Sequence, residues 1–303
     1  MRFGLLGTGY WAAETHAAAL AAHPDVEFAA VWGRDPEKAS ALARRYGAER
    51  YDTADDLIKA VDAVAIALPP DVQAELAEQA AAAGRHLLLD KPVALTAAAA
   101  DRVAAAAHRA GVATVVFFTK RFETEIETFL GSLAASGPWD GARVTLLYSI
   151  YEPNSPYAGS AWRREHGGLW DIGPHALSVV LPVLGHVDRV AAASGPHETT
   201  HVLLTHASGA VSTLALTLSA PENARASEYL FAGPPGFATL PASSETPVEA
   251  FGHAIGELIA AAAEGNTEHR CGAGFGAEVT RVLAAAETAR RDGVTVTVGG
   301  SGA

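Results

Sequence analysis

The sequence predicts an α/β protein with a doubly wound parallel sheet over residues 1–120 and a second domain, with a mostly antiparallel sheet, over residues 121–303. Three observations predict this class. Short apolar runs alternate with helical segments in the first part, longer paired runs follow Arg121, and 303 residues suit two domains. A chain that is 49% hydrophobic and 18% charged is also not a disordered one.

Short apolar or β-branched runs are the expected strands of the first sheet: Phe3–Leu6, Val26–Trp32, Ala63–Leu68, His86–Leu89 and Thr114–Phe118. The segments between them have helical composition. One begins at Asp35-Pro36 and ends at Gly47, and another begins at Thr96 and ends at Gly111. Strands that alternate with such helices form βαβ units, so we expect parallel strands with helices on both faces.

The second part contains longer strands. Ser208-Gly209 is a hairpin signal between two of them. Leucines alternate with small residues in Ala210–Ser219, which predicts a sheet covered by a helix on one face. We expect the final helices to pack back on the first domain. The expected elements are a helix around Ile126–Leu133 ended by Gly137-Pro138, strands at Arg143–Tyr151, His201–His206, Ala210–Ser219 and Ser227–Phe231, helices at Val248–Ala263 and Ala277–Arg291, and a strand at Val294–Val298.

Charge and cysteine content limit the partners. Lys and Arg number 22 against 34 Asp and Glu, a net charge of −12, which argues against nucleic acid. The single cysteine, Cys271, excludes an internal disulfide and favours a reducing compartment. We see no signal peptide, no apolar stretch of ~18 residues and no compact metal-ligand cluster. The expectation is a cytoplasmic protein without a membrane or metal partner.

A glycine-rich motif, Gly7-Thr8-Gly9-Tyr10-Trp11-Ala12, directly follows the first strand and opens a helix. This is the G-x-G-x-x-G/A arrangement in the context that dinucleotide binding requires. Gly7 allows the tight turn, Gly9 lets a pyrophosphate approach the backbone, and Ala12 lets the helix pack on the strand. The alternative is an ordinary glycine-rich turn.

The end of the second strand predicts which dinucleotide binds. Enzymes that use NAD usually place an acid ~20 residues beyond the glycines, where it binds the ribose 2′-hydroxyl. Here Gly33 stands at that place and Arg34 follows it, and a guanidinium can pair with a 2′-phosphate. Asp35 is explained as the cap of the Pro36 helix. The sequence therefore predicts NADP in preference to NAD.

Two motifs suggest catalysis. Asp90-Lys91-Pro92 follows the fourth strand, where side chains face the cofactor crevice, and Leu68-Pro69 ends the neighbouring strand beside it. Much later, Gly167-Gly168 precedes Asp171 and His175, which are four residues apart and so share one face of a helix. A histidine beside a carboxylate is suited to proton exchange near neutral pH.

Together these motifs resemble the glucose–fructose oxidoreductase / inositol dehydrogenase (Gfo/Idh/MocA) family over essentially the whole chain. In that family a Glu-Lys-Pro motif is usual, and this chain carries Asp90 before the lysine. The resemblance implies a Rossmann domain, a second domain with a large open sheet that often forms dimer or tetramer contacts, and catalytic positions at Lys91, Asp171 and His175. It also implies hydride transfer between NAD(P) and a hydroxyl carbon of a sugar, cyclitol or related polyol.

Residues that read the substrate are expected in two places. Arg121 follows the last parallel strand, and Trp162 and Arg163 lie in a loop before the Asp171 helix, although a plain surface loop explains each of them equally well. His16, like His23, is interpreted as structural or solvated. Two other functions stay open: a non-catalytic dinucleotide-binding regulator, and a glycosidase-like enzyme that uses transient oxidation.

Overall fold

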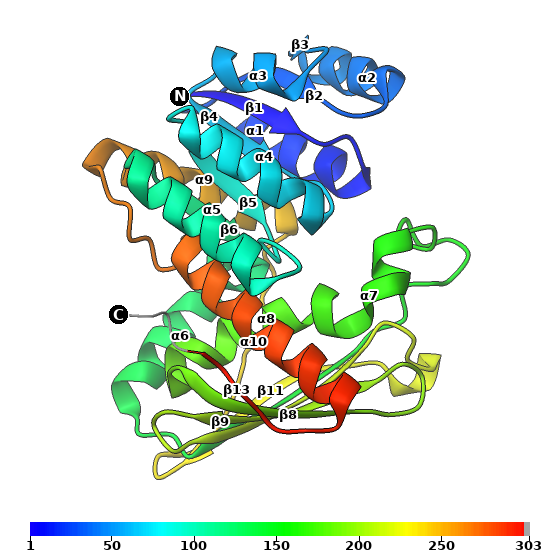
Figure 1. Cartoon of the computed structure of the whole chain (residues 1–303), viewed down its shortest axis with the longest axis vertical. Coiled ribbons are helices and arrows are strands. Elements are labelled where there is room, and N and C mark those ends of the chain that lie inside the picture. The colour runs from blue at the N-terminus through cyan, green and yellow to red at the C-terminus, as the bar shows by residue number, and fades with distance from the viewer. Residues whose placement is uncertain (300–303) are drawn as a thin grey trace. The chain divides into compact units, whose positions relative to one another are not determined.

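The computed structural model describes residues 1–299, which form two compact units with separate sheets (Figure 1). One unit joins Met1–Glu123 to Ser244–Glu278. The other joins Thr124–Ser243 to the segment that begins at Val279. Gly300 and the residues after it, at the end of the second predicted domain, lie outside the described residues.

The first unit is built on a parallel sheet, as predicted. Within the described chain its six strands have the order β3-β2-β1-β4-β5-β6, the order of a doubly wound dinucleotide-binding fold. They are β1 (Arg2–Leu6), β2 (Glu27–Trp32), β3 (Glu49–Arg50), β4 (Ala63–Ile66), β5 (His86–Asp90) and β6 (Thr114–Phe117). The helices are α1 (Ala17–Ala22), α2 (Pro36–Tyr46), α3 (Ala54–Ala60), α4 (Pro70–Ala82), α5 (Ala97–Ala110) and α9 (Pro247–Glu264).

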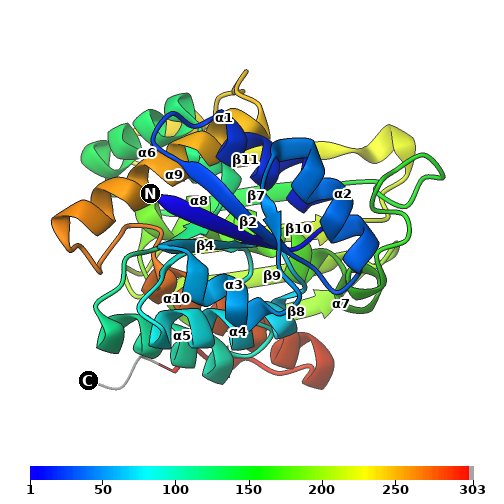
Figure 2. The same cartoon turned by 90° about the horizontal axis from the view of Figure 1, so that it is seen from above.

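Helices cover both faces of this sheet. Figure 2 shows α1 and α9 on one side and α4 and α5 on the other, and each of these pairs is in contact. The helix ends follow the sequence signals: the Asp35 side chain accepts hydrogen bonds from two backbone N–H groups of α2, and Gly47 and Gly111 end α2 and α5 in the left-handed conformation. The strand expected at Ala63–Leu68 ends at Ile66, because prolines 69 and 70 start α4 and lack N–H groups.

The second unit is built on a mostly antiparallel sheet, as predicted. Its seven described strands have the order β12-β11-β7-β10-β9-β8-β13, and β7 and β10 are the one parallel pair among these seven strands. They are β7 (Gly141–Leu147), β8 (Val187–Ser194), β9 (Thr200–His206), β10 (Val211–Thr217), β11 (Ala226–Gly233), β12 (Gly236–Thr239) and β13 (Val296–Thr297). The helices are α6 (Thr124–Ser136), α7 (Ala161–Asp171), α8 (Gly173–Leu184) and, from Val279 onward, α10 (Ala273–Asp292).

Only one face of this sheet is covered by helices of its unit. Leu214 and Leu216 of β10 are buried on the side that α7 and α8 cover, whereas Thr213 is exposed. The hairpin at Ser208-Gly209 is confirmed, since β9 and β10 are antiparallel neighbours.

Two strand expectations in this unit need correction. The strand expected at Arg143–Tyr151 ends at Leu147, and beyond it only an isolated bridge joins Ser149 to Ser219 within the described chain. The strand β8 was not expected, because its alanines and charged residues carry little β signal. Among residues 1–299, no helix is both long enough and apolar enough to cross a membrane.

Candidate active site

The glycine loop of the first unit offers bare backbone to a ligand. Gly7 has a φ of 137°, and a Cβ there would lie 2.4 Å from the Ala67 carbonyl oxygen, so the tight turn requires glycine. The Gly7 N–H donates to the Trp32 carbonyl at 2.9 Å and ties the loop to β2. Apart from Gly9 and its two chain neighbours, no described residue has an atom within 4 Å of the position that a Cβ on Gly9 would take. This is the arrangement that a pyrophosphate group needs.

The helix expected after the loop begins with a π-helical turn, η1 (Ala12–His16), before α1 continues it. Such turns occur often at functional sites. Tyr10 is 54% exposed, Thr8 and Trp11 are half-buried, and Ala12 is buried. His16 is fully buried, so the interpretation of this histidine as solvated is excluded.

The end of β2 carries a glycine where NAD enzymes usually place an acid, and a larger residue there would require the Thr8 side chain to shift. A Cβ on Gly33 would lie 2.5 Å from Cγ2 and 2.8 Å from Oγ1 of Thr8. Asp35 is engaged as the cap of α2, with its Oδ1 3.0 and 3.2 Å from the two backbone nitrogens that donate to it. The Arg34 side chain is exposed and has no interaction partner among residues 1–299.

The carboxyl ends of β4 and β5 carry the segments predicted to line the crevice. Leu68-Pro69, after β4, is half-buried. Lys91 is half-buried in the turn after β5, and its N–H donates to Asp90 Oδ1 at 2.8 Å. Gln73 of α4 holds the same turn: its Nε2 donates to the carbonyls of Asp90 (2.8 Å) and Pro92 (3.0 Å), and its Oε1 accepts from the Asp90 N–H (3.0 Å). Sequence reasoning missed Gln73.

The Asp90 carboxylate is held in its charged form inside the protein. Burial raises the pKa of Asp90, but the His16 imidazole, the Lys91 ammonium and the Lys91 N–H together outweigh burial and lower the pKa below its usual range. His16 Nε2 lies 3.7 Å from Asp90 Oδ2.

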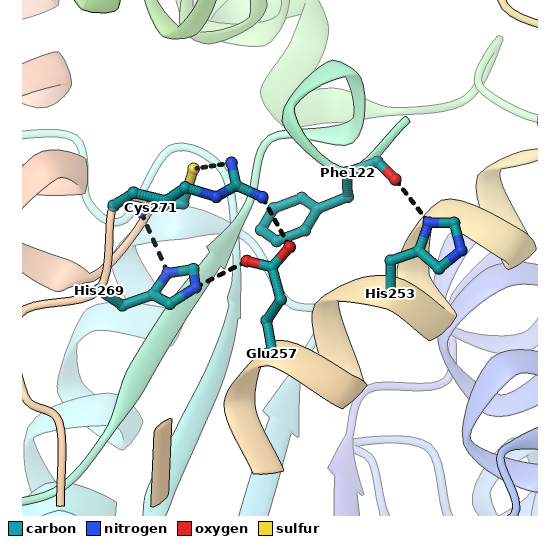
Figure 3. Close-up of polar contacts among 6 residues, drawn as sticks. Phe122, His253, Glu257, His269 and Cys271 are labelled. Carbon is teal, nitrogen blue, oxygen red and sulfur yellow. Dashed lines mark hydrogen bonds and ion pairs between the residues drawn. The ribbon is translucent and has the colours of Figure 1, made fainter. Parts of the chain in front are cut away.

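Arg121 lies in a short 3₁₀ turn, η2 (Thr119–Phe122), directly after β6. Its side chain is only 4% exposed, and its guanidinium lies 5.8 Å from the centre of the Phe275 ring. His253 of α9 anchors the turn, because its Nδ1 donates to the Phe122 carbonyl at 2.8 Å (Figure 3).

The Phe122 ring is held in turn by a polar cluster drawn in Figure 3. His269 stacks parallel to the ring, and the Arg270 guanidinium lies 5.0 Å from the ring centre. Glu257 of α9 accepts a hydrogen bond from each of these two residues, both at 2.7 Å. Burial raises the pKa of Glu257, but the two partners lower it by more than burial raises it, so the pKa lies below its usual range. The cluster therefore fixes the turn that carries Arg121.

The predicted catalytic pair of the second unit lies at a helix junction. Asp171 is the last residue of α7, and His175 lies in the first turn of α8, with Ile172 between the two helices. The expectation of a single helix is therefore corrected. Pro174 explains the break, since it has no N–H to continue the hydrogen bonds of α7 and suits the start of a new helix. Asp171 is buried, and His175 is half-buried.

The two glycines before this junction have separate structural roles. Gly167 has a φ of 65°, which makes a kink inside α7. A Cβ on Gly168 would lie 2.9 Å from Thr217 Cα, so glycine here lets α7 approach the backbone of β10. Asp171 is thereby carried close to the sheet.

Arg163 holds the Asp171 carboxylate. Its Nε donates to Asp171 Oδ2 at 3.0 Å, and its Nη1 donates to Ser160 Oγ at 3.3 Å. Its guanidinium also lies 4.6 Å from the ring centre of Tyr157 and 5.0 Å from that of Trp162. Trp162 and Arg163 belong to the first turn of α7 and not to the loop that was expected. A first helical segment precedes the kink at Gly167 and carries both residues, which the sequence pattern did not indicate.

Tyr151 is a further polar residue beside this pair. Its hydroxyl is buried and has no hydrogen-bond partner within residues 1–299. Burial and the nearby charges of Glu198 and Asp171 raise the pKa of this phenol. Arg164 lies over the ring at 4.4 Å. In the part of the chain that the structure describes, no group of three His, Cys, Asp or Glu residues could hold a metal ion.

Comparisons with known proteins identify relatives of this chain and of its fold. Residues 1–118 match the sequence profile described as "Oxidoreductase family, NAD-binding Rossmann fold". The chain is 31% identical to dTDP-3,4-didehydro-2,6-dideoxy-alpha-D-glucose 3-reductase of Streptomyces antibioticus over 247 residues, which are 78% of this chain and 74% of the relative. It is 26% identical to inositol 2-dehydrogenase of Rhizobium meliloti over 223 residues, 69% of this chain and 66% of the relative.

Solved structures share the fold. The WlbA dehydrogenase from Bordetella pertussis, determined in complex with NADH and UDP-GlcNAcA, matches with a TM-score of 0.87 and 21% identity, covering 99% of this chain and 98% of that one. GenD2 from gentamicin A biosynthesis, determined in complex with NAD, matches with a TM-score of 0.82 and 22% identity, covering 99% of this chain and 97% of that one.

Proposed function

Because the chain belongs to the Gfo/Idh/MocA family of oxidoreductases, with their NAD-binding Rossmann fold, we propose that it transfers a hydride reversibly between NADP, in preference to NAD, and a hydroxyl carbon of a sugar, cyclitol or related polyol. The observation that carries the proposal is the Lys91 turn. Lys91 is half-buried at the carboxyl end of a parallel strand, in the unit that carries the glycine loop. Its backbone N–H donates to Asp90, and Gln73 of α4 in turn holds the backbone of Asp90.

The residues of the first unit fit a dinucleotide. Bare backbone at Gly9 would receive the pyrophosphate, and the exposed Arg34 would pair with a 2′-phosphate. Gly33, packed against Thr8, leaves no carboxylate to bind a ribose 2′-hydroxyl at that position, which supports NADP. When bound, the nicotinamide supplies the hydride acceptor or donor.

Side chains of this protein carry out the proposed proton transfer and stabilise the charge that it produces. His175 takes the proton of the substrate hydroxyl as the general base, because an imidazole changes charge near neutral pH. Asp171, fixed by Arg163, orients the imidazole or tunes it. Lys91 stabilises the negative charge that develops on the substrate oxygen. Trp162 offers an aromatic face, and Arg121 a positive charge, for recognition of the substrate.

A spectrophotometric screen tests the reaction. Formation of reduced cofactor is followed at 340 nm with NADP and with NAD over a panel of aldoses, cyclitols and sugar acids. His175→Asn is expected to lower kcat by about 10²–10⁴-fold, whereas His186→Asn, the same substitution at an exposed histidine, leaves kcat unchanged. Activity of the His175 variant close to wild type would refute the assignment of the base.

The same screen separates the two other functions. A regulator would bind cofactor without turnover of any substrate. An enzyme that uses transient oxidation would cleave glycosides with no net change at 340 nm and with cofactor that remains bound.

Cofactor preference has its own test. Quenching of tryptophan fluorescence gives the affinity for NADPH and NADH in wild type, Arg34→Ala and the matched control Lys38→Ala. Loss of a charge-assisted pair of about 1.5–3 kcal/mol predicts that Arg34→Ala weakens NADPH roughly 10–150-fold and leaves NADH unchanged. Equal affinities of the wild type for the two cofactors would refute the preference for NADP.

The open face of the second sheet supports a homodimer or homotetramer. It carries a hollow of about 500 Å³ lined by strands β7, β8, β9 and β10, and Leu203 is 45% exposed on this face. Light scattering of Leu203→Glu is expected to show a smaller assembly than wild type.

A further inference from the structure

His16 occupies an aromatic pocket in the first unit. The side chain is fully buried at the end of the π-helical turn. Its ring centre lies 4.1 Å from that of Phe251, 6.4 Å from that of Phe117 and 6.4 Å from that of Trp11. A phenylalanine would satisfy such a pocket, so packing alone does not explain a histidine at this position.

The two nitrogens of His16 are buried and make no hydrogen bond within residues 1–299. A buried polar group without a partner is destabilising, and native proteins rarely keep one without a reason. The polar group that Nε2 faces is the Asp90 carboxylate, 3.7 Å away. That distance exceeds a hydrogen bond but lies within the range of an electrostatic contact.

The Asp90 carboxylate is part of the Lys91 turn and has few charged neighbours. Its Oδ1 accepts the Lys91 N–H, and so the carboxylate is part of the turn that presents Lys91. Of the described groups, His16 from η1 and Lys91 from the turn are the titratable ones that act on the carboxylate. Gln73 from α4 binds only the backbone of this segment, and α9 and β6 contribute phenylalanines to the pocket. Without His16, burial of the carboxylate would be opposed by Lys91 alone.

We propose that His16 is a positioning residue that acts through Asp90: it keeps the carboxylate turned toward the Lys91 backbone and so fixes the turn that presents Lys91. The inference rests on the role proposed above for Lys91. The π-helical turn directs His16 toward Asp90, because the extra residue in that turn changes the direction in which the helix presents its side chains.

Two substitutions at His16 distinguish the contribution of the imidazole nitrogens from that of the aromatic ring. His16→Phe keeps an aromatic ring in the pocket and removes the nitrogens, while His16→Gln restores an N–H donor at the level of Nε2. Since small displacements of catalytic groups cost up to ~10²-fold in rate, we expect His16→Phe to lower kcat about 10–100-fold, with cofactor affinity within about twofold of wild type. His16→Gln is expected to recover most of the loss. His23→Phe, at the end of α1, is the matched control and is expected to behave as wild type.

A measurement without substrate keeps this test apart from the test of the reaction. Limited acetylation with acetic anhydride, followed by mass spectrometry, compares the reactivity of Lys91 with that of the exposed Lys38 and Lys59 in the same sample. In His16→Phe, a looser turn is expected to raise acetylation of Lys91 about fivefold relative to these two lysines. Asp90→Asn is expected to give the same change, and the double variant no more than either single one.

The outcomes are distinct. If Lys91 acetylation rises but wild type oxidises no substrate of the panel, the proposed reaction fails and the role of His16 stands. Wild-type kcat and wild-type Lys91 acetylation in His16→Phe would overturn the role of His16 and leave the reaction intact. If His16→Phe does not fold, Asp90→Asn decides, and unchanged Lys91 acetylation in that variant would overturn the inference.

Discussion

Replacing Gln73 by leucine tests how far the Lys91 turn depends on one distant side chain. Gln73 is 1% exposed and lies on α4, and its amide makes three hydrogen bonds of 3.0 Å or less to the backbone of Asp90 and Pro92. Leucine has nearly the same volume, so the substitution removes the hydrogen bonds without opening a cavity.

The magnitude follows from the groups that lose a partner. One backbone N–H and two carbonyls lose the amide, at about 1–3 kcal/mol for each group that stays buried. Because the Asp90 end of the turn is partly exposed, water can replace some of these bonds, and we expect a loss of about 2–4 kcal/mol in the free energy of unfolding. Displacement of the turn by about 1 Å would lower kcat roughly 10²-fold.

Thermal unfolding followed by circular dichroism measures the first effect, and the 340 nm assay measures the second. A loss of this size corresponds to a fall in Tm of roughly 5–15 °C. Gln79→Leu is the control, because Gln79 lies on the same helix with an exposed side chain. A Gln73→Leu protein with the Tm and kcat of Gln79→Leu would show that the turn holds its shape without the clamp, and the reasoning would be wrong.

Two further predictions concern stability. The pKa of Glu257 lies below its unfolded value of about 4.3, so its stabilising contribution is present above that pH and is lost as the pH falls through the lower folded pKa. Glu257→Gln is therefore expected to cost about 1 kcal/mol in urea unfolding at pH 7 and progressively less as the pH falls through the folded pKa, and a difference independent of pH would contradict the assignment. Gly168→Ala places a Cβ 2.9 Å from Thr217 Cα and is expected to lower unfolding free energy by about 1–3 kcal/mol, while Gly131→Ala, in open space on α6, raises it by about 0.5–1 kcal/mol. Equal effects of these two alanines would be the contrary result.

Features set by a few neighbouring residues were predictable from the sequence. The cap at Asp35, the left-handed glycine at Gly47 and the glycine loop after β1 each depend on local backbone geometry, and the structure has all three. The parallel direction of the strands in the first sheet followed from the alternation of strands and helices, because a parallel connection needs a crossover.

Features set by contacts between distant segments were not predictable. Gln73 is 17 residues from Asp90, and its role depends on where α4 docks against β5. His16 faces Asp90 because the helix begins with a π-helical turn, which no composition signal reports. In the same way, the sequence did not indicate that the Arg163 guanidinium, expected to read the substrate, also binds Asp171 eight residues along the chain.

These distant contacts are alike in that each holds a neighbour of a predicted catalytic residue, and this determines which kinetic constant a substitution should alter. In each unit a predicted catalytic residue is fixed through its neighbour: Gln73 and His16 act on Asp90 beside Lys91, and Arg163 acts on Asp171 near His175 in the sequence. None of the three supporting side chains needs to touch a ligand to fulfil this role. Substitutions at Gln73, His16 or Arg163 should therefore alter kcat more than cofactor affinity, whereas Arg34, exposed and without a partner among residues 1–299, should alter affinity alone. A chain of net charge −12 can hold an anionic cofactor in this way, because the charges that bind it are local.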